Sequence, residues 1–385
     1  MTRYLKAFVC LAAAFILAPA PAQTADQTKP AAKPVPIVYV ARPTHIDGFV
    51  VASNGKLTPV PGSPLANIAV ASLAGNGKYL FGSTSDGTHI DAFSIASNGS
   101  LTLSASTEVD NVLSGACVYA SPLLLDHTGA TLYAAATVGG LCDSTDYESF
   151  QIESGGTLKY LGDSGQTFLY NKPLTISSNN NFAFGADCVD YEGGYIDTFA
   201  AYARSSSGHL ALDGSITAPV PKTKSTADFY CRSQAAGDPS SHIAVSLQAI
   251  NSDSQSPDGS PQLATYSANS HGDLTTKSTY ANMPVSATGV NVLAMSPSGK
   301  LLAVGGQGLQ IFHFNGSSPI TKDSGVLQPA VAFNALAWDS ENHLYALSGG
   351  QLFVYTVTSS SISQATGSPY SIPEAVALVV QSVTP

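Results

Sequence analysis

The sequence predicts an all-β, seven-bladed β-propeller with four-stranded antiparallel blades, closed into a ring by its own C-terminal strand. Two repeated patterns and a mismatch between the chain ends predict this fold class, because internal repeats are the signature of repeat architectures. The first pattern is an aromatic residue, a short polar turn that usually holds glycine, and an aliphatic residue, as in a β-hairpin. Its seven copies are FVVASNGKL (49–57), FSIASNGSL (93–101), FQIESGGTL (150–158), YARSSSGHL (202–210), YSANSHGDL (266–274), FHFNGSSPI (312–320) and YTVTSSSI (355–362).

A second pattern precedes each hairpin, and it is a short apolar run of the kind expected of a buried strand. These runs are IVYVA (37–41), YLFGS (79–83), TLYAA (131–135), FAFGA (182–186), HIAVS (242–246), LLAVG (301–305) and HLYAL (343–347). Another apolar strand and a turn stand before six of them, for example VLAMSPSGK (292–300). Each unit therefore has four strands, and such units repeated around an axis are propeller blades.

The two ends of the chain are offset by one strand. The first unit begins at its second strand, at Ile37, and the chain ends with a surplus strand, AVALVVQ (375–381). We expect this surplus strand to complete the first blade, because an open ring would leave an unpaired apolar strand edge. A β-sandwich or an extended solenoid is the alternative, and the matched missing and surplus strands argue against both.

The N-terminal residues predict export. Arg3 and Lys6 form a basic region, residues 8–17 an apolar one, and Ala20-Pro21-Ala22 a cleavage site before Gln23. We therefore expect residues 1–22 to be a signal peptide and the protein to be secreted or periplasmic. The alternative is a membrane anchor, but a span needs about 20 apolar residues. The proline-containing segment 23–36 is expected to be a flexible tether, and residues 37–385 the propeller.

The charge balance excludes some partners. The chain has 16 Lys and Arg against 26 Asp and Glu, and loss of residues 1–22 leaves 14 basic residues and a formal charge of −12. Such a balance argues against nucleic acid and anionic lipid as partners. We expect no membrane insertion and a monomer. Charged residues are 11% of the chain, so Ser, Thr, Asn and Gly solvate the surface instead.

The repeats resemble those of the lactonase-type seven-bladed propeller family, which includes the propeller form of 6-phosphogluconolactonase. The resemblance rests on FVVASNGKLTPVPGSP (49–64), on its echo ATGSPY (365–370) and on YVA (39–41). It implies a lactonase-like shape, with ligands bound in the funnel formed by the second-to-third-strand and fourth-to-first-strand loops. The G-P-R-H-like motif of those enzymes is absent; FYCRSQAAGDP (229–239) offers Arg232 out of register. No catalytic residue can therefore be carried over.

The polar residues of the predicted funnel loops gather mainly on units one to five. The ligand-binding candidates are Asp143, Asp187, Asp190, Glu192, Arg232, His45 and His89. Arg232 can pair an anionic substrate, or it can simply neutralise Asp187 or Asp228. His45 and His89 occupy equivalent repeat positions, which favours a structural role. The carboxylates can serve acid–base chemistry if their environments separate their pKa values, or they can be solvated loop residues.

Four cysteines remain after export: Cys117, Cys142, Cys188 and Cys231. An even number in an exported protein favours disulfides over free thiols, and of three possible pairings we prefer 117–142 with 188–231. No metal or cofactor is expected, because the histidines do not have zinc spacings. Asn251, Asp253 and Gln255 begin like a calcium loop, but Gln262 stands where the loop needs Glu.

Two functions follow from these observations. The first is a lactone hydrolase, or a related enzyme acting on sugar acids in the funnel, as the resemblance implies. The second is a non-catalytic propeller that serves as a binding module or scaffold for a glycan or protein, which the missing motif favours. An enzyme acting on anionic sugars needs Arg or Lys in its pocket, so the side chains that line the funnel discriminate between the two.

Overall fold

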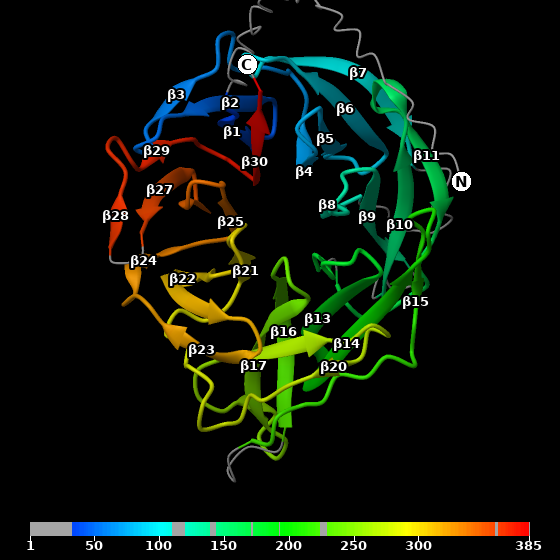
Figure 1. Ribbon diagram of the computed structural model, residues 1–385, viewed down its shortest axis with the longest axis vertical. Coiled ribbons are helices and arrows are strands. Elements are labelled where there is room, and N and C mark those ends of the chain that lie inside the picture. Colours follow the sequence, from blue (N-terminus) through cyan, green and yellow to red (C-terminus); the bar gives the residue numbers. More distant parts are fainter. Residues whose placement is uncertain are drawn as a thin grey trace, which may run out of the picture. The chain divides into compact units, whose positions relative to one another are not determined.

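The computed structural model describes residues 33–109, 120–138, 144–170, 172–191, 193–223, 229–358 and 361–384. Within the unit Pro34–Pro385, seven antiparallel sheets are arranged around a central channel (Figure 1). The sheets contain four strands each, with one additional short strand in the fifth and in the seventh. The seven-bladed β-propeller that the repeats predict is therefore confirmed.

The blades are numbered along the chain, and their strands are given from the channel outward. Blade one is β30 (Ala377–Val383), β1 (Val35–Ala41), β2 (Ile46–Val51) and β3 (Leu57–Pro59); blade two is β4 (Val70–Gly75), β5 (Tyr79–Thr84), β6 (His89–Ile95) and β7 (Leu101–Glu108). Blade three is β8 (Leu123–Leu125), β9 (Thr131–Val138), β10 (Ser144–Ile152) and β11 (Leu158–Gly162), with a 3-10 turn η1 (Ser154–Gly156); blade four is β12 (Thr175–Ile176), β13 (Phe182–Tyr191), β14 (Gly194–Arg204) and β15 (Leu210–Leu212).

The remaining blades carry extra strands or fused ones. Blade five is β16 (Phe229–Gly237), β17 (His242–Asn251), β19 (Gln262–Ala268) and β20 (Leu274–Thr275), with β18 (Ser256–Pro257) beside β17; blade six is β21 (Val292–Met295), β22 (Leu301–Asn315) and β23 (Ser318–Lys322), with β24 (Leu327–Ala332) beside β22; blade seven is β25 (Ala335–Trp338), β26 (His343–Ser348), β27 (Gln351–Val357) and β28 (Ile362–Gln364), with β29 (Tyr370–Ser371) beside β27. Strand β22 supplies both the second and third strands of its blade, since the Phe314 N–H donates to the Lys300 carbonyl at 2.8 Å.

The C-terminal strand closes the ring as predicted. Strand β30 pairs with β1 in antiparallel register, from Val35 opposite Val383 to Ala41 opposite Ala377. Strand β1 begins two residues earlier than expected, at Val35, and β30 begins and ends two residues later, at 377–383. The reason is that Val383 is itself buried in the core of blade one, so the pairing extends to the end of both strands.

The hairpin glycines of the first repeat pattern lie against the preceding blade. A Cβ at each would stand 2.4–3.3 Å from a residue near the start of that blade's second strand. The pairs are Gly55 with His343, Gly99 with Ile37, Gly156 with Tyr79, Gly208 with Thr131, Gly272 with Phe182 and Gly316 with His242. Glycine recurs there because the hairpin backbone must come close to its neighbour.

Two tyrosines complete this contact with a hydrogen bond. The Tyr39 hydroxyl donates to the Gly99 carbonyl, and the Tyr133 hydroxyl donates to the Gly208 carbonyl, both at 2.8 Å. Both tyrosines are fully buried. A buried hydroxyl needs a partner, and the hairpin carbonyl of the next blade supplies it, so each bond ties one blade to the next.

The turns between first and second strands are closed by a short polar side chain. In six blades this side chain accepts from the backbone N–H that begins the second strand, at 2.8–3.2 Å, as Asx- and Ser-turns do. The acceptors are Asn76, Asp126, Ser177, Asp238, Ser296 and Asp339. We call this end of the ring, which also bears the hairpin glycines, the turn side, and the opposite end the funnel side.

A buried ion pair lies where blade seven meets blade one. His343 Nδ1 lies 2.6 Å from Asp339 Oδ2, and the Tyr345 hydroxyl donates to the same oxygen at 2.9 Å. The pKa of His343 is raised, mainly by Asp339 and further by a hydrogen bond to the Ser53 carbonyl of blade one. The pKa of Asp339 is lowered by these hydrogen bonds and by His343, against the opposing effect of burial.

Replacing Gly99 by alanine is expected to destabilise the fold by about 2–4 kcal/mol, because a Cβ would stand 2.4 Å from Ile37 Cδ1 at a φ of 85°. Gly62→Ala is the matched control, since Gly62 has a φ of 87° with nothing within 4 Å of its Cβ position. Urea unfolding of both variants separates the contact from the backbone strain. Equal losses in the two variants would show that the contact between blades has no stabilising role.

Candidate functional site

The central channel contains a cavity of about 770 Å³ near the funnel side, which we call the channel cavity. It is lined by residues at or just before the inner strands of all seven blades. These are Ala71, Ser72, Leu73, Ser121, Pro122, Leu123, Tyr170, Lys172, Pro173, Gln234, Asn291, Val292, Leu293, Asn334, Ala335, Leu336, Val376, Ala377 and Leu378. A volume of this size accommodates a small molecule.

Three side-chain amides line this cavity, those of Gln234, Asn291 and Asn334. These amides form no hydrogen bond with other described residues. Asn291 and Asn334 directly precede β21 and β25. Gln234 follows a β-bulge in β16, where the register shifts after Arg232, and bulges commonly re-aim a side chain. Each amide can donate and accept hydrogen bonds.

Lys172 is the only charged residue among the described residues that line the channel cavity. Its position is set locally, since its N–H donates to the Leu169 carbonyl at 2.9 Å and its carbonyl accepts from the Tyr147 hydroxyl at 2.6 Å. Pro173 follows and restricts the backbone of Lys172 to extended conformations. The ammonium lies 3.2 Å from Asp187 Oδ1, which anchors the cation at the wall.

Asp187 on β13 is 4% exposed and does not itself line the channel cavity. Burial raises the pKa of its carboxyl, although the Lys172 ammonium acts in the opposite direction. Lys172 and Asp187 thus form a partly desolvated ion pair beside the channel. The predicted candidate Asp187 is therefore connected to the cavity through a lysine that the sequence analysis did not select.

Arg232, the predicted cationic candidate, is engaged elsewhere. Its guanidinium donates to both carboxylate oxygens of Asp197 on β14, at 3.0 and 2.8 Å, and lies 4.8 Å from the Phe199 ring centre. Arg232 is 8% exposed and is not among the residues that line the cavity. Its partner among the described residues is Asp197 rather than Asp187, and Asp228, the other partner that we considered, lies outside the described residues. Asp197 lies on blade four, next to the blade that carries Arg232, and no local sequence pattern indicates a contact between the two blades.

The other candidates lie away from the channel cavity or outside the described residues. His45 lies 3.5 Å from Asp47 Oδ2, and His89 hydrogen-bonds Thr88. Asp190 is exposed near the end of β13. Asp143 and Glu192 fall outside the described residues, as does Asp228. The wall also includes Asn291 of blade six and Asn334 of blade seven. We expected the polar groups of the funnel to come from units one to five, so these two residues were not predicted.

Two carboxylates of blade three have different environments. Asp146 accepts hydrogen bonds from the N–H and hydroxyl of Ser164, both at 2.9 Å. Glu148 is 3% exposed, and burial raises its pKa to about 7. Neither residue lines the channel cavity. Glu148 Oε2 is buried without a hydrogen-bond partner among the described residues, so little offsets the effect of burial on this carboxyl.

A disulfide joins Cys188 on β13 to Cys231 on β16, so it crosses from blade four to blade five. This confirms one of the two predicted pairs. The other, Cys117–Cys142, lies outside the described residues and stays a prediction. The disulfide and the Arg232–Asp197 ion pair occupy the same seam between blades, because Cys231 and Arg232 are consecutive on β16.

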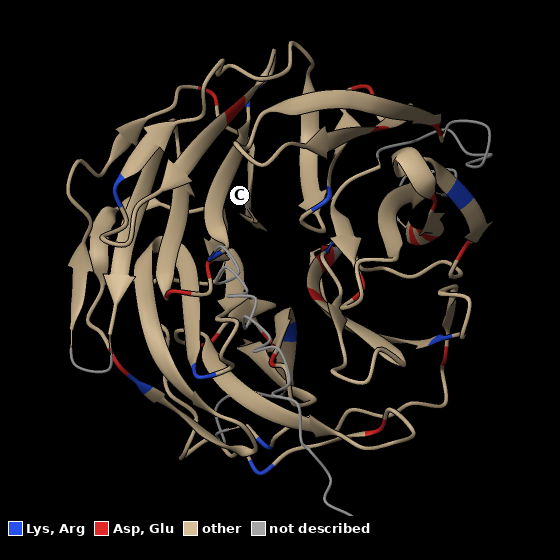
Figure 2. Cartoon of the chain, turned by 45° about the horizontal axis from the view of Figure 1, so that its top comes forward, with Lys and Arg blue, Asp and Glu red and all other residues tan. Residues whose placement is uncertain are grey.

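Charged residues are sparse over the whole ring, and most of the ribbon in Figure 2 carries neither sign. In the described part of the chain, no group of three or more His, Cys, Asp or Glu side chains could hold a metal ion. The same residues include no helix with the length and apolar character that a bilayer span requires. Asn251 Oδ1 accepts from the N–H groups of Asp253 and Ser254, as in a simple polar turn.

The fold and the channel cavity define this chain as a seven-bladed propeller with an axial pocket. A scan against protein-family models finds no match, and a search of curated proteins finds none either. Solved structures do resemble it. A candidate 6-phosphogluconolactonase from Bacteroides uniformis has 14% sequence identity and a TM-score of 0.60, over 91% of this chain and 100% of that one.

Two further structures show the same likeness. A candidate 6-phosphogluconolactonase from Bacteroides fragilis is 14% identical with a TM-score of 0.56, over 90% of this chain and 98% of that one. A functionally unknown protein from Desulfotomaculum acetoxidans is 11% identical with a TM-score of 0.59, over 91% and 99%. At such identities the likeness establishes the fold.

Removing the disulfide by a Cys188→Ser/Cys231→Ser double substitution is expected to cost about 2–4 kcal/mol of stability, because the bridge closes a chain segment with a sequence separation of 43 residues. Chemical unfolding, followed by the urea midpoint, measures the loss. Reduction serves as the control, and it should lower the midpoint of the wild type by more than that of the variant, because the variant has no Cys188–Cys231 bridge to lose. A variant as stable as the oxidised wild type would contradict this role.

Proposed function

We propose that the channel cavity binds a sugar acid or its lactone. The observation that carries this proposal is the Lys172 ammonium in a cavity that is also lined by the amides of Gln234, Asn291 and Asn334, which have no hydrogen-bond partner among the described residues. One cation suits one carboxylate or phosphate. Amides that both donate and accept suit the hydroxyls of a sugar. The likeness to candidate lactonases supports the same class of ligand.

Lys172 and Asp187 can also hydrolyse the lactone. Asp187 takes a proton from a water molecule, whose oxygen attacks the lactone carbonyl carbon, while the Lys172 ammonium stabilises the negative charge that develops on the carbonyl oxygen. The ring carbon–oxygen bond then breaks, and the proton on Asp187 passes to the departing ring oxygen. The product is the open hydroxy acid, so water and lactone are consumed in equal numbers.

A non-catalytic binding function is the second candidate, and one specific observation favours it. Asp187 is buried behind Lys172 and is not exposed to the channel cavity. A base must come within hydrogen-bond reach of the water that it activates. If Asp187 only anchors Lys172, the propeller binds the sugar acid without turning it over, and the two functions differ in the role of this one carboxylate.

We also propose that the protein acts outside the cytoplasm, after loss of residues 1–22 as a signal peptide. The Cys188–Cys231 disulfide supports this location, because such bonds persist in oxidising compartments. A sugar acid or lactone in the secreted or periplasmic space would then be the ligand.

Replacing Lys172 by glutamine is expected to weaken the binding of gluconate at least tenfold, since the charge-assisted hydrogen bond to the carboxylate is lost. Isothermal titration calorimetry measures the affinity. Lys300→Gln is the matched control, because Lys300 lies on the turn side and does not line the channel cavity. Unchanged gluconate affinity in the Lys172 variant would overturn the site.

Replacing Asp187 by asparagine is expected to abolish hydrolysis of glucono-δ-lactone above the spontaneous rate while gluconate still binds, because Lys172 keeps its charge. In the wild type the rate should fall as the pH drops through the pKa of Asp187, which burial raises, since only the carboxylate accepts the proton. A pH-stat assay follows both proteins. Retained binding with no turnover in either protein would select the non-catalytic function.

A further inference from the structure

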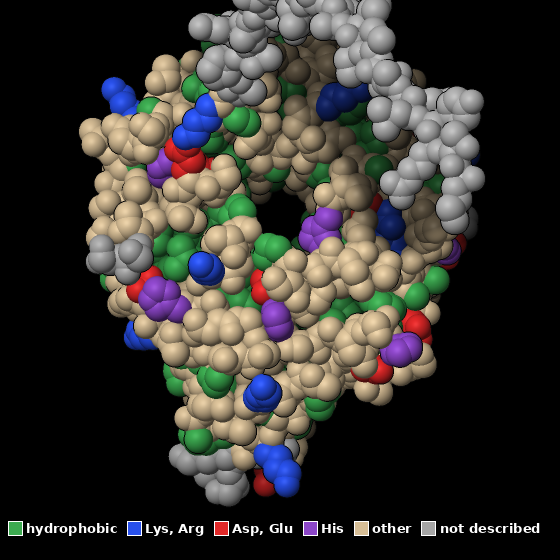
Figure 3. Space-filling model, viewed as in Figure 1, with side chains coloured by type: hydrophobic (Ala, Val, Ile, Leu, Met, Phe, Trp, Pro, Cys, Tyr) green, Lys and Arg blue, Asp and Glu red, His purple; other side chains and the backbone are tan. Residues whose placement is uncertain are grey.

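A second cavity, of about 550 Å³, lies at the opposite, turn-side mouth of the channel, and we call it the turn-side pocket. Blades three to seven contribute to it. The lining residues are His127, Ser178, Gly237, Asp238, Pro239, Ala294, Met295, Ser296, Pro297, Leu336, Ala337 and Trp338. Leu336 lines both cavities. Figure 3 shows the open channel, with histidine side chains scattered over the face that surrounds it.

The wall of the turn-side pocket is apolar on the side of blades six and seven. Met295, Leu336 and Trp338 supply most of its large side chains. Trp338 is 8% exposed, and its indole N–H donates to the Ala294 carbonyl at 3.0 Å. The one polar atom of the indole is therefore already paired, so Trp338 offers a ligand only its hydrocarbon surface.

His127 provides a hydrogen-bond acceptor on the opposite side of the pocket. Its Nε2 lies 3.0 Å from the Ile176 carbonyl oxygen. A carbonyl can only accept, so Nε2 carries the proton, and in the neutral ring Nδ1 keeps its lone pair. Nδ1 forms no hydrogen bond with any other described residue.

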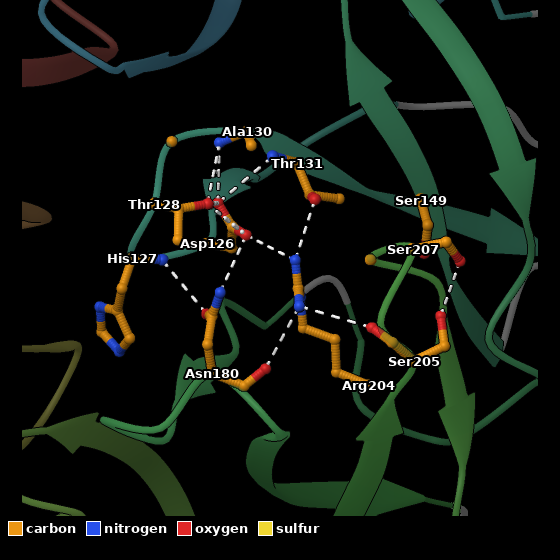
Figure 4. A network of polar contacts seen from close by, with 12 residues as sticks. Asp126, His127, Thr128, Ala130, Thr131, Ser149, Asn180, Arg204, Ser205 and Ser207 are labelled. Atoms are coloured by element: carbon orange, nitrogen blue, oxygen red, sulfur yellow. Dashed lines mark hydrogen bonds and ion pairs between the residues drawn. The ribbon is translucent and has the colours of Figure 1, made fainter.

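A partly buried network, centred on the buried Asp126 carboxylate, holds the backbone of the exposed His127 in place. The His127 backbone N–H donates to Asn180 Oδ1 at 3.2 Å, and Asn180 donates to Asp126 at 2.9 Å. Arg204 forms an ion pair with the same carboxylate at 2.6 Å. Figure 4 shows the His127 ring directed away from this network. The acceptor is thus presented by a rigid base, which lowers the entropic cost of binding.

The charge of the turn-side pocket disfavours anions. Among the described residues that line it there is no Lys or Arg, and they include Asp238 with its carboxylate. This carboxylate accepts from the His242 backbone N–H at 2.8 Å and lies 3.0 Å from His242 Nδ1. A sugar acid suited to Lys172 would find no cation here, and most sugar hydroxyls would lack partners on the apolar wall.

We propose that the turn-side pocket binds a small, neutral, hydroxyl-bearing aromatic compound of the phenol class. The aromatic ring packs on Met295, whose thioether interacts favourably with aromatic rings, and on Trp338. The hydroxyl donates to His127 Nδ1. The two cavities share Leu336 in their walls, but this proposal does not rest on the sugar-acid ligand proposed for the channel cavity.

The chain's single tryptophan makes the site directly observable, because Trp338 lines the pocket. Titration of the wild-type protein with p-cresol, with excitation selective for tryptophan, is expected to give a saturable change in Trp338 emission. Toluene, which lacks the hydroxyl, should bind at least tenfold more weakly, and benzoate should produce no saturable change. Equal affinities for p-cresol and toluene, or no saturable change with p-cresol, would overturn the proposal.

Substitution of His127 by phenylalanine is expected to remove the preference for p-cresol over toluene while toluene binding stays within twofold of wild type. His271→Phe is the matched control, since His271 is exposed on the same side of the ring and does not line the pocket. The Lys172→Gln protein should bind p-cresol as the wild type does, which separates this site from the channel cavity. A His127 variant that still prefers p-cresol would assign the hydroxyl to another partner and overturn the role of His127.

Discussion

The propeller depends on one repeated contact, in which a hairpin glycine lies against the start of the second strand of the preceding blade. Six glycines make this contact, including Gly55, which places blade one on blade seven. At Gly99 and Gly208 a buried tyrosine of the preceding blade also donates to the glycine carbonyl. Because the blades are held at their turn-side ends in this way, their inner strands converge on the axis, and the channel cavity is the space that they leave.

The fold could be predicted because its determinants are periodic in sequence. The hairpin glycine and the buried second strand recur in the sequence, and their repeats give the number of blades. The surplus strand at 375–381 matches the strand that the first unit lacks, and this match predicts the closure. The disulfide between Cys188 and Cys231 was predicted from cysteine count and loop position. The residues of the candidate site were harder to predict from the sequence. Lys172 stands in a connection with no repeat signal, and the pairing of Arg232 with Asp197 is a contact between facing blades.

The two ends of the channel differ in chemistry although the same inner strands build both. At the funnel side the lining includes the Lys172 ammonium and the amides of Gln234, Asn291 and Asn334. At the turn side, thioether, indole and leucine surfaces lie beside the imidazole of His127 and the carboxylate of Asp238. The difference arises because residues just before an inner strand belong to variable connections, whereas residues at its end must pack between the turns of neighbouring blades. One axis therefore ends in two mouths that differ in the chemistry of their lining side chains.

The seams of the ring also differ in what holds them. The seam between blades four and five contains a covalent bond, and the seam between blades seven and one contains the buried His343–Asp339 pair. A histidine whose pKa is raised in the folded state stabilises fully below its unfolded pKa, and this contribution is lost as the pH rises through the raised value. For Asp339, whose pKa is lowered, the contribution is lost as the pH falls through that lowered value. Reducing agents thus act on one seam, and a pH above the raised pKa of His343 or below the lowered pKa of Asp339 acts on another, so the ring has two separate places at which its surroundings can loosen it.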